Sequence, residues 1–295
     1  MLTPQTKTTK LATKLGLLVP LYLKREDLHP YGSHKGRSIP VMIDNYAKQG
    51  VKNFVVSSSG NAALAAALHI IQYNKTHRDH SLSLKIMVGL EIDLTKLEIL
   101  KKLPCENLTI EQVKNPKQTA FQLDKDGLAK NLRQSNDNVA LAGYAELAKE
   151  LASASGGKLS AVFIPTSSGT TAEGLWLAFK KLKINPQIHI VQTTACHPIA
   201  DAVNGPTKIT GMSSAKAIVD KVALRKNKVA EAIKMSGGAA WIATDHEIKS
   251  AIDLVKDSEN IDISSNSALS IAGLVRAIAC GQKFTGAVVC LITGR

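Results

Sequence analysis

Hydrophobic and polar residues alternate along the chain in two patterns, short apolar runs and longer segments with apolar positions at helical spacing. Short runs rich in β-branched residues predict buried strands, and apolar positions three and four residues apart predict amphipathic helices. The predicted strands are residues 21–24, 53–57, 84–88, 108–113, 161–165, 187–192, 239–243 and 287–292. The predicted helices are residues 36–48, 61–73, 94–103, 117–134, 144–153, 170–181, 246–256 and 267–280.

The regular alternation of strand and helix predicts the class of fold. Parallel neighbouring strands need a crossover connection, which is usually a helix, so the pattern indicates an α/β architecture with mostly parallel sheets. Loops of glycine, serine and threonine follow several predicted strands, and open sheets bind ligands at such strand ends. The chain of 295 residues is long enough for one large or two ordinary domains.

Composition limits the kind of protein that this chain can be. A hydrophobic content of 44% and a charged content of 21% are typical of a soluble globular protein. No run of about 18 apolar residues predicts a transmembrane helix, and the N-terminus lacks the apolar core and cleavage site of a signal peptide. We therefore expect a cytoplasmic protein without a membrane partner.

The formal net charge of +13 raises the question of nucleic-acid binding. The lysines are scattered along the chain, and the aromatic content of 4% leaves few rings to stack on bases. We expect no nucleic-acid partner. Most of the charge then faces solvent, and a smaller share favours anionic ligands such as phosphates and carboxylates.

Motifs of several common enzyme classes are absent from the sequence. There is no GxSxG elbow, no GxxxxGK[ST] loop and no GxGxxG fingerprint, so a dinucleotide enzyme is disfavoured. No cysteine or histidine cluster has the spacing of a metal site, and His29, His69 and His197 are expected to be structural or at the surface. The cysteines are predicted to be buried, reduced thiols. They are Cys105, Cys196, Cys280 and Cys290.

A single lysine stands at the predicted start of the first long helix. In the segment LYLKREDLHPYGSHKGR, residues 21–37, an apolar run ends in charged residues and a Pro-Tyr-Gly turn, followed by Lys35. A lysine at a helix start between small residues can lie against a bound ligand, and lysine forms Schiff bases when its surroundings lower its pKa. Most lysines are solvated, so this segment matters only together with the motifs downstream.

Two loops of small residues each follow a predicted strand and open a predicted helix. The first is SSSGNAA at residues 57–63, and the second is PTSSGTT at residues 165–171. The first turn of a helix offers unpaired N–H groups and a favourable dipole, so both loops are candidate anion sites. An ordinary capped helix start is the alternative for each loop.

The order and spacing of these motifs resemble those of fold-type II pyridoxal-phosphate enzymes over nearly the whole chain. That family includes threonine synthase, serine/threonine dehydratase, cysteine synthase and the tryptophan synthase β chain. Its members carry a lysine segment like KRED…P.GSFKDR, an (S/T)SGN loop, a GSGGT-like loop and a terminal LTGxG or SGRG segment, in that order. Here His34 replaces the usual aromatic residue, and Gly36 replaces the usual acidic residue.

The resemblance implies a tryptophan synthase β-like fold of two three-layer α/β/α domains with mostly parallel sheets. Residues 1–45 plus 143–295 would form a large domain that binds pyridoxal 5'-phosphate. Residues 46–142 would form a small mobile domain that closes over a small amino-acid substrate. Family members are expected to be homodimers.

The resemblance also implies roles for individual residues. Lys35 would hold the cofactor as a Schiff base and later act as the base for the Cα proton. The substrate carboxylate would bind Ser58, Ser59 and Gly60, and Asn61 would hydrogen-bond the cofactor's ring hydroxyl. The cofactor phosphate would bind Ser167, Ser168, Gly169, Thr170 and Thr171. Thr293 would meet the pyridine nitrogen.

The loop at residues 165–171 is poorer in glycine than its counterparts in the family. Ser167 and Thr170 stand where glycine is common, so the backbone would be strained there if those positions need a positive φ. Hydroxyl groups at these positions could instead bond phosphate oxygens. The resemblance further implies pocket-lining roles for a set of residues and a structural role for Glu150. The pocket set is His34, Gly143, Asp262, Ser264 and Ser265.

The resemblance as a whole implies a lyase that acts on a small amino acid by β/γ-elimination or replacement. The closest match in appearance is threonine synthase, which converts O-phosphohomoserine to threonine. Serine/threonine dehydratase and cysteine or tryptophan synthase-like chemistry are the alternatives within the family. A catalytically silent relative with a binding role is the alternative outside enzymes.

Overall fold

The computed structural model describes residues 2–103 and 106–294, and these form two compact units. The first unit comprises Met1–His29 and Tyr144–Arg295, and the second comprises Pro30–Gly143. Both are α/β units built around a largely parallel sheet, which confirms the predicted fold class. Cys105 and Arg295 lie outside the described residues.

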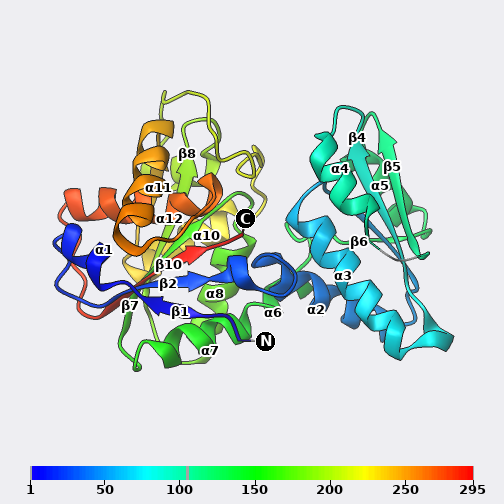
Figure 1. Ribbon diagram of the computed structural model, residues 1–295, viewed down its shortest axis with the longest axis horizontal. Helices are drawn as coiled ribbons and strands as arrows, with labels where there is room; N and C mark the ends of the chain where they lie inside the picture. Colours follow the sequence, from blue (N-terminus) through cyan, green and yellow to red (C-terminus); the bar gives the residue numbers. More distant parts are fainter. Residues whose placement is uncertain (1, 104–105, 295) are drawn as a thin grey trace. The chain divides into compact units, whose positions relative to one another are not determined.

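The first unit contains a six-stranded sheet in the order β1-β2-β10-β7-β8-β9. Figure 1 labels β1, β2, β10, β7 and β8 of this sheet. Only β1 is antiparallel to its neighbour, and the other pairs are parallel. Parallel pairing brings the carboxyl ends of the strands to one edge, where ligands bind in open sheets. The strands are β1 (Gln5–Lys7), β2 (Leu21–Arg25), β7 (Leu159–Pro165), β8 (Gln187–Thr193), β9 (Ala240–Ala243) and β10 (Ala287–Ile292).

Helices cover both faces of this sheet because its strands are apolar on both sides. In β10, Val288 and Cys290 belong to the core cluster under α1, α11 and α12, whereas Val289 and Leu291 belong to the cluster under α7, α8, α9 and α10. Continuous apolar strands of this kind are typical of parallel sheets buried on both faces. The helices are α1 (Thr9–Lys14), α7 (Ala145–Ala154), α8 (Thr170–Lys181), α9 (Pro198–Asn204), α10 (Lys226–Ser236), α11 (Asp245–Glu259) and α12 (Ser265–Ala279).

The second unit contains a four-stranded parallel sheet in the order β5-β4-β3-β6. Phe54 and Val56 of β3 pack with α2 and α3, and Val55 packs against Ala120 of α5. The strands are β3 (Asn53–Ser57), β4 (Ser83–Gly89), β5 (Leu108–Val113) and β6 (Lys130–Asn131). The helices are α2 (Lys35–Ala47), α3 (Asn61–Thr76), α4 (Leu94–Lys101), α5 (Pro116–Lys125) and α6 (Val139–Ala142).

All eight predicted strands are present, but one predicted helix was wrong over half its length. The helix predicted at 117–134 ends at Lys125, because Gly127 adopts a positive φ of 70° and the chain then forms β6. None of the helices in residues 2–103 and 106–294 is both long and apolar enough to cross a membrane.

The sequence predicted a large domain of residues 1–45 plus 143–295 and a small mobile domain of residues 46–142. This division stays a prediction. The compact units differ from it in residues 30–45, because α2 packs with α3 and α6 and so groups with the second unit. They also differ at Gly143, which belongs to the second unit.

Candidate active site

Lys35 is the first residue of α2 and lies in the second unit. Its side chain is half-buried, and burial lowers the pKa of its amine to about 8. The turn before it is tightly bonded, since the Lys35 N–H donates to Ser33 Oγ at 3.3 Å and the Gly36 N–H donates to Ser33 O at 3.0 Å. Lys35 is therefore a desolvated amine on a fixed turn.

A chain of hydrogen bonds connects the same turn to α2 and α3. His69 Nε2 donates to Asp44 Oδ1 at 2.7 Å, which leaves Nδ1 to accept from the Tyr31 hydroxyl at 3.2 Å. Burial, and then the negative charge of Asp44, raise the pKa of Tyr31. His69 thus has a structural role, which agrees with the expectation for this histidine. It anchors Tyr31, four residues before Lys35.

Gly143 ends α6 where this helix packs against α2. A Cβ at this position would lie 2.2 Å from the carbonyl oxygen of Arg37, closer than any real contact. Glycine is required here by the close approach of the two backbones. The sequence resemblance placed Gly143 at the cofactor's face, and that role stays a prediction.

The first loop of small residues joins β3 to α3 in the second unit, as expected. Asn61 is the first residue of α3, and Gly60 is its N-cap without a side-chain bond. The hydroxyl of Ser58 accepts from the Gly60 N–H at 3.2 Å. Ser58 and Ser59 are half-buried and line a cavity of about 490 Å³ at the carboxyl edge of the sheet.

The second loop joins β7 to α8 in the first unit. Within residues 165–171, all of which are described, only Gly169 has a positive φ, at 91°. Ser167 and Thr170 avoid that region, so the strain considered for these two positions does not arise. A Cβ at residue 169 would lie 2.8 Å from Cγ2 of Val229. This loop conformation therefore needs one glycine.

The hydroxyl groups of this loop have protein partners. Ser167 Oγ accepts from the N–H groups of Val219 and Asp220 at 3.1 and 3.2 Å. Ser168 and Thr170 bond each other at 3.0 Å, and Thr171 Oγ1 donates to the Tyr144 hydroxyl at 3.1 Å. The first-turn amides of α8 have no acceptor within the helix. Those amides are the groups best suited to bind a phosphate.

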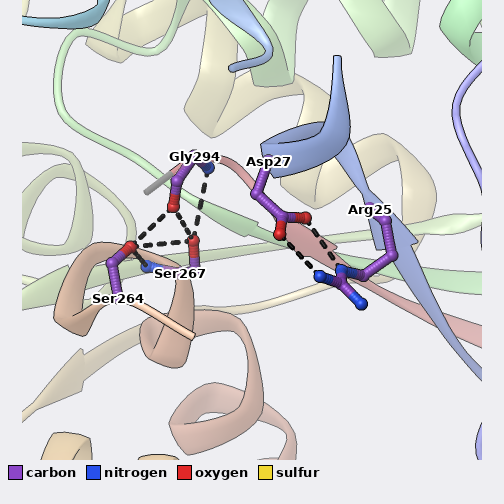
Figure 2. Close-up of polar contacts among 5 residues, drawn as sticks. All are labelled: Arg25, Asp27, Ser264, Ser267 and Gly294. Carbon is purple, nitrogen blue, oxygen red and sulfur yellow. Dashed lines mark hydrogen bonds and ion pairs between the residues drawn. The ribbon is translucent and has the colours of Figure 1, made fainter. Parts of the chain in front are cut away.

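Thr293 follows β10 and is buried. Because β10 pairs in parallel with β7, Thr293 and the loop after β7 start from the same edge of the sheet. The next residue is bonded to the start of α12, as Figure 2 shows. Ser264 Oγ and Ser267 Oγ donate to Gly294 O at 2.7 and 2.8 Å, and the Gly294 N–H donates to Ser267 Oγ at 3.3 Å. These bonds fix the position of the backbone beside Thr293.

The charged residues of the KRED segment form bonds within the first unit. Arg25 donates two hydrogen bonds to the carboxylate of Asp27 at 2.9 and 2.7 Å (Figure 2). Lys24 is buried and donates to Glu150 Oε2 at 2.5 Å. Glu150 therefore has a structural contact, in line with its expected role.

The remaining predicted pocket residues receive less support. Asp262 is 84% exposed, and its carboxylate forms an ion pair with Lys256 at 2.8 Å. Its negative charge is therefore balanced at the surface. His34 is the N-cap of α2, next to Lys35, and Ser265 is the first residue of α12. Their roles toward a ligand stay predictions.

The cysteines only partly follow the prediction of burial. Cys196 and Cys290 are free and buried, and burial raises the pKa of both thiols. For Cys280 the prediction was wrong, because this residue caps the surface end of α12 and its thiol is exposed.

Sequence reasoning missed three residues near these loops. Ser267 is fully buried and bonds Gly294, and its only signal was its place three residues after an N-cap serine. Lys114 and Lys117 line the same cavity as Ser58 and Ser59. They follow the carboxyl end of a predicted strand, which was the available signal.

These two units, each built on an open and largely parallel sheet with a small-residue loop at its carboxyl edge, define an α/β protein of the tryptophan synthase β-like class. The chain belongs to the family of pyridoxal-phosphate dependent enzymes (PALP), whose family model matches residues 2–294. Its cofactor is pyridoxal 5'-phosphate.

Curated relatives and solved structures agree with this assignment. The chain is 26% identical to threonine synthase of Methanocaldococcus jannaschii over 309 residues, covering 99% of this chain and 74% of that protein. It is 34% identical to human L-serine dehydratase/L-threonine deaminase over 137 residues, covering 44% of this chain and 38% of that protein. The processed form of threonine deaminase isoform 2 from Solanum lycopersicum superimposes with a TM-score of 0.80 at 19% identity, covering 99% of this chain and 83% of that chain. That last likeness shows the fold alone.

The residues present fit this cofactor. Lys35 supplies a desolvated amine with a lowered pKa, the chemistry that lysine needs to bind an aldehyde. The loop that ends in Gly169 supplies the N-terminus of a 12-residue helix, which suits a phosphate. Thr293 supplies a hydroxyl at the same edge of the sheet as that loop.

Proposed function

We propose that this protein is a lyase that acts on a small amino acid by β/γ-elimination or replacement. In its reaction O-phosphohomoserine loses its γ-phosphate and gains a hydroxyl group from water at Cβ, which gives threonine and phosphate. The observation that carries the proposal is the amine of Lys35, half-buried in the first turn of α2 with a pKa of about 8. Threonine synthases among its relatives match 99% of the chain, which supports this choice of reaction.

Pyridoxal phosphate, when bound, withdraws electrons from the amino acid and so makes its Cα proton acidic. Lys35 would hold the cofactor, and its Nζ would accept the Cα proton of the substrate. An amine with a pKa of about 8 is half neutral at about pH 8, and a part of it is still neutral at physiological pH. The neutral amine can accept a proton.

Other residues bind and orient. Ser58, Ser59 and the Gly60 amide hold the substrate carboxylate at the start of α3, and Asn61 bonds the ring hydroxyl. The first-turn amides of α8 hold the phosphate. Thr293 offers a hydroxyl to the ring nitrogen, and a hydroxyl, unlike a carboxylate, does not keep that nitrogen protonated. A homodimer in the cytoplasm is part of the same proposal.

A dehydratase is the second candidate. The 34% identity to human L-serine dehydratase/L-threonine deaminase over 44% of the chain favours it. A dehydratase would release a 2-oxo acid from serine or threonine, whereas a threonine synthase would release threonine and phosphate from O-phosphohomoserine. Product analysis therefore separates the two.

The first test is an absorbance spectrum of the purified protein before and after borohydride. We expect a band at roughly 410–430 nm, the region of a pyridoxal group bound to lysine, that borohydride bleaches. Lys35→Ala should lack the band and lose about 10³-fold in turnover, because both the attachment and the base are gone. Lys48→Ala, at the exposed far end of α2, is the matched control and should keep both.

A protein that stays colourless with added cofactor would contradict the proposal and favour the catalytically silent relative. A bleachable band without products from O-phosphohomoserine, serine or threonine would leave the cofactor chemistry intact and overturn the reaction.

A further inference from the structure

The cavity of about 490 Å³ in the second unit has one wall that the proposed function does not use. One side is Ser57–Ser59 at the end of β3, and the next is Met87, Val88 and Gly89 at the end of β4. The far side is the turn between β5 and α5, residues 114–118. A cavity of this volume is in the range of small-molecule sites.

The far side of the cavity is cationic. Lys114 and Lys117 line it, and none of the described residues that line it is acidic. Among residues 2–103 and 106–294 neither lysine has an ion-pair partner, whereas Lys85 on the neighbouring β4 pairs with Glu111 at 3.3 Å. Two positive charges without a carboxylate beside them raise the local concentration of anions.

The backbone at this turn adds to the same preference. Asn115 is the N-cap of α5 without a side-chain bond to the helix, and Pro116 occupies the first position. The remaining first-turn amides have no acceptor within the helix. The turn therefore presents lysine ammonium groups and unpaired N–H donors together.

We propose that this cavity binds an anionic group on the side chain of the substrate, with Lys114 and Lys117 as its cationic partners. The inference rests on the proposed function, because the opposite wall contains Ser58 and Ser59, which are assigned to the substrate carboxylate. An amino acid bound there extends its side chain across the cavity toward the lysines. The substrate class is an amino acid with a phosphate or a second carboxylate, in preference to serine or threonine.

The test uses the holoenzyme, whose cofactor already fills its own phosphate loop, and titrates it with inorganic phosphate by calorimetry. The variant Lys114→Gln/Lys117→Gln should bind phosphate about tenfold more weakly or worse, since each charge-assisted bond contributes at least that factor. Lys125→Gln, an exposed position at the end of the same helix, makes a matched single-charge change outside the cavity. It should stay within about twofold of the wild type.

Equal weakening in Lys125→Gln would overturn the inference, because the effect would then be a general loss of positive charge. An unchanged phosphate affinity in the double variant would overturn it as well. Both lysines are exposed, so the double variant is expected to fold, and circular dichroism checks this.

Steady-state kinetics shows whether the substrate carries a phosphate or a carboxylate on its side chain. It also tests this inference separately from the proposed function. The double variant should show a raised KM for O-phosphohomoserine or aspartate, whichever the wild type uses, with KM for serine within about twofold. A raised KM for serine as well would contradict a side-chain subsite. A holoenzyme that turns over no amino acid would contradict the proposed function, while the phosphate titration would still decide this inference.

Discussion

At the scale of single residues, burial decides the chemistry of several polar side chains. His189 of β8 is fully buried and stacks on Phe163 with ring centroids 4.4 Å apart. The indole N–H of Trp241 donates to its Nδ1 at 3.2 Å, so Nε2 carries the proton and donates to Gln187 Oε1 at 3.0 Å. Burial lowers the pKa of His189 to about 3, and the ring stays neutral in the folded protein.

This histidine predicts a pH dependence of stability. Below the ordinary histidine pKa of 6.5 the unfolded chain binds a proton at His189 that the folded protein does not bind until about pH 3. The unfolding free energy contributed by His189 is therefore fully present above pH 6.5 and falls as the pH decreases toward 3. The slope is at most about 1.4 kcal/mol per pH unit.

Urea titrations between pH 7 and pH 4.5 would measure this slope, and His189→Gln should lower it. An identical slope in the variant would show that other groups cause the pH dependence.

Residue chemistry could be predicted where it depends on local sequence. The place of Lys35 at the start of a helix could be predicted, because the preceding turn and the small neighbours are visible in the chain itself. Ser267 was missed because its partner Gly294 is 27 residues away, and such a contact forms only when α12 and β10 pack. The link between Tyr31 and His69 spans 38 residues and was hidden for the same reason.

At the scale of elements, the join between β10 and α12 shows how the end of a strand is positioned. Ser264 caps α12 by accepting from the Ser267 N–H at 3.4 Å, and both serines also donate to Gly294 O. The same two serines therefore cap the helix and bind the residue that follows the strand. Loss of one serine affects both elements.

Ser267→Ala should lower the unfolding free energy by about 1–3 kcal/mol, because it leaves a buried carbonyl and a buried N–H short of a partner. Urea denaturation measures the loss. Ser265→Ala, in the same turn of α12 and without a hydrogen bond to Gly294, is the control and should cost less. Equal costs would show that the effect comes from the helix and not from its bond to the strand end.

Strands and long helices could be predicted because their apolar pattern is continuous. The two-residue β6 and the four-residue α6 could not, since neither is long enough to show a period. Helix α10 was not predicted either, although Val229 and Ile233 are buried at helical spacing. Its basic residues make the segment resemble a polar loop. They are Arg225, Lys226, Lys228 and Lys234.

At the scale of the whole molecule, the two compact units each have a core of their own. Both tryptophans, Trp176 in α8 and Trp241 in β9, lie in the first unit. Tryptophan fluorescence therefore reports the unfolding of the first unit, whereas circular dichroism reports both. The alternation of strands and helices predicted both sheets. It could not show how residues 30–45 group, because that depends on the packing of α2 with α3 and α6.

We expect Ile86→Ala, a fully buried position in β4, to destabilise the second unit by about 2–5 kcal/mol. The part of the circular dichroism transition that comes from the second unit should move to lower urea. The fluorescence midpoint, which reports the first unit, should stay unchanged. Ile190→Ala, fully buried in β8, should shift the fluorescence midpoint. If Ile86→Ala moves both probes together, the chain unfolds as a single cooperative unit.

The backbone of the loop after β7 has a consequence for how such enzymes are recognised in genomes. Only Gly169 needs the left-handed conformation, at φ 91°, and its neighbours can carry side chains. A search pattern written as several consecutive glycines would overlook chains of this type. A pattern that requires one glycine immediately before a helix, and tolerates serine or threonine around it, describes what evolution must preserve here.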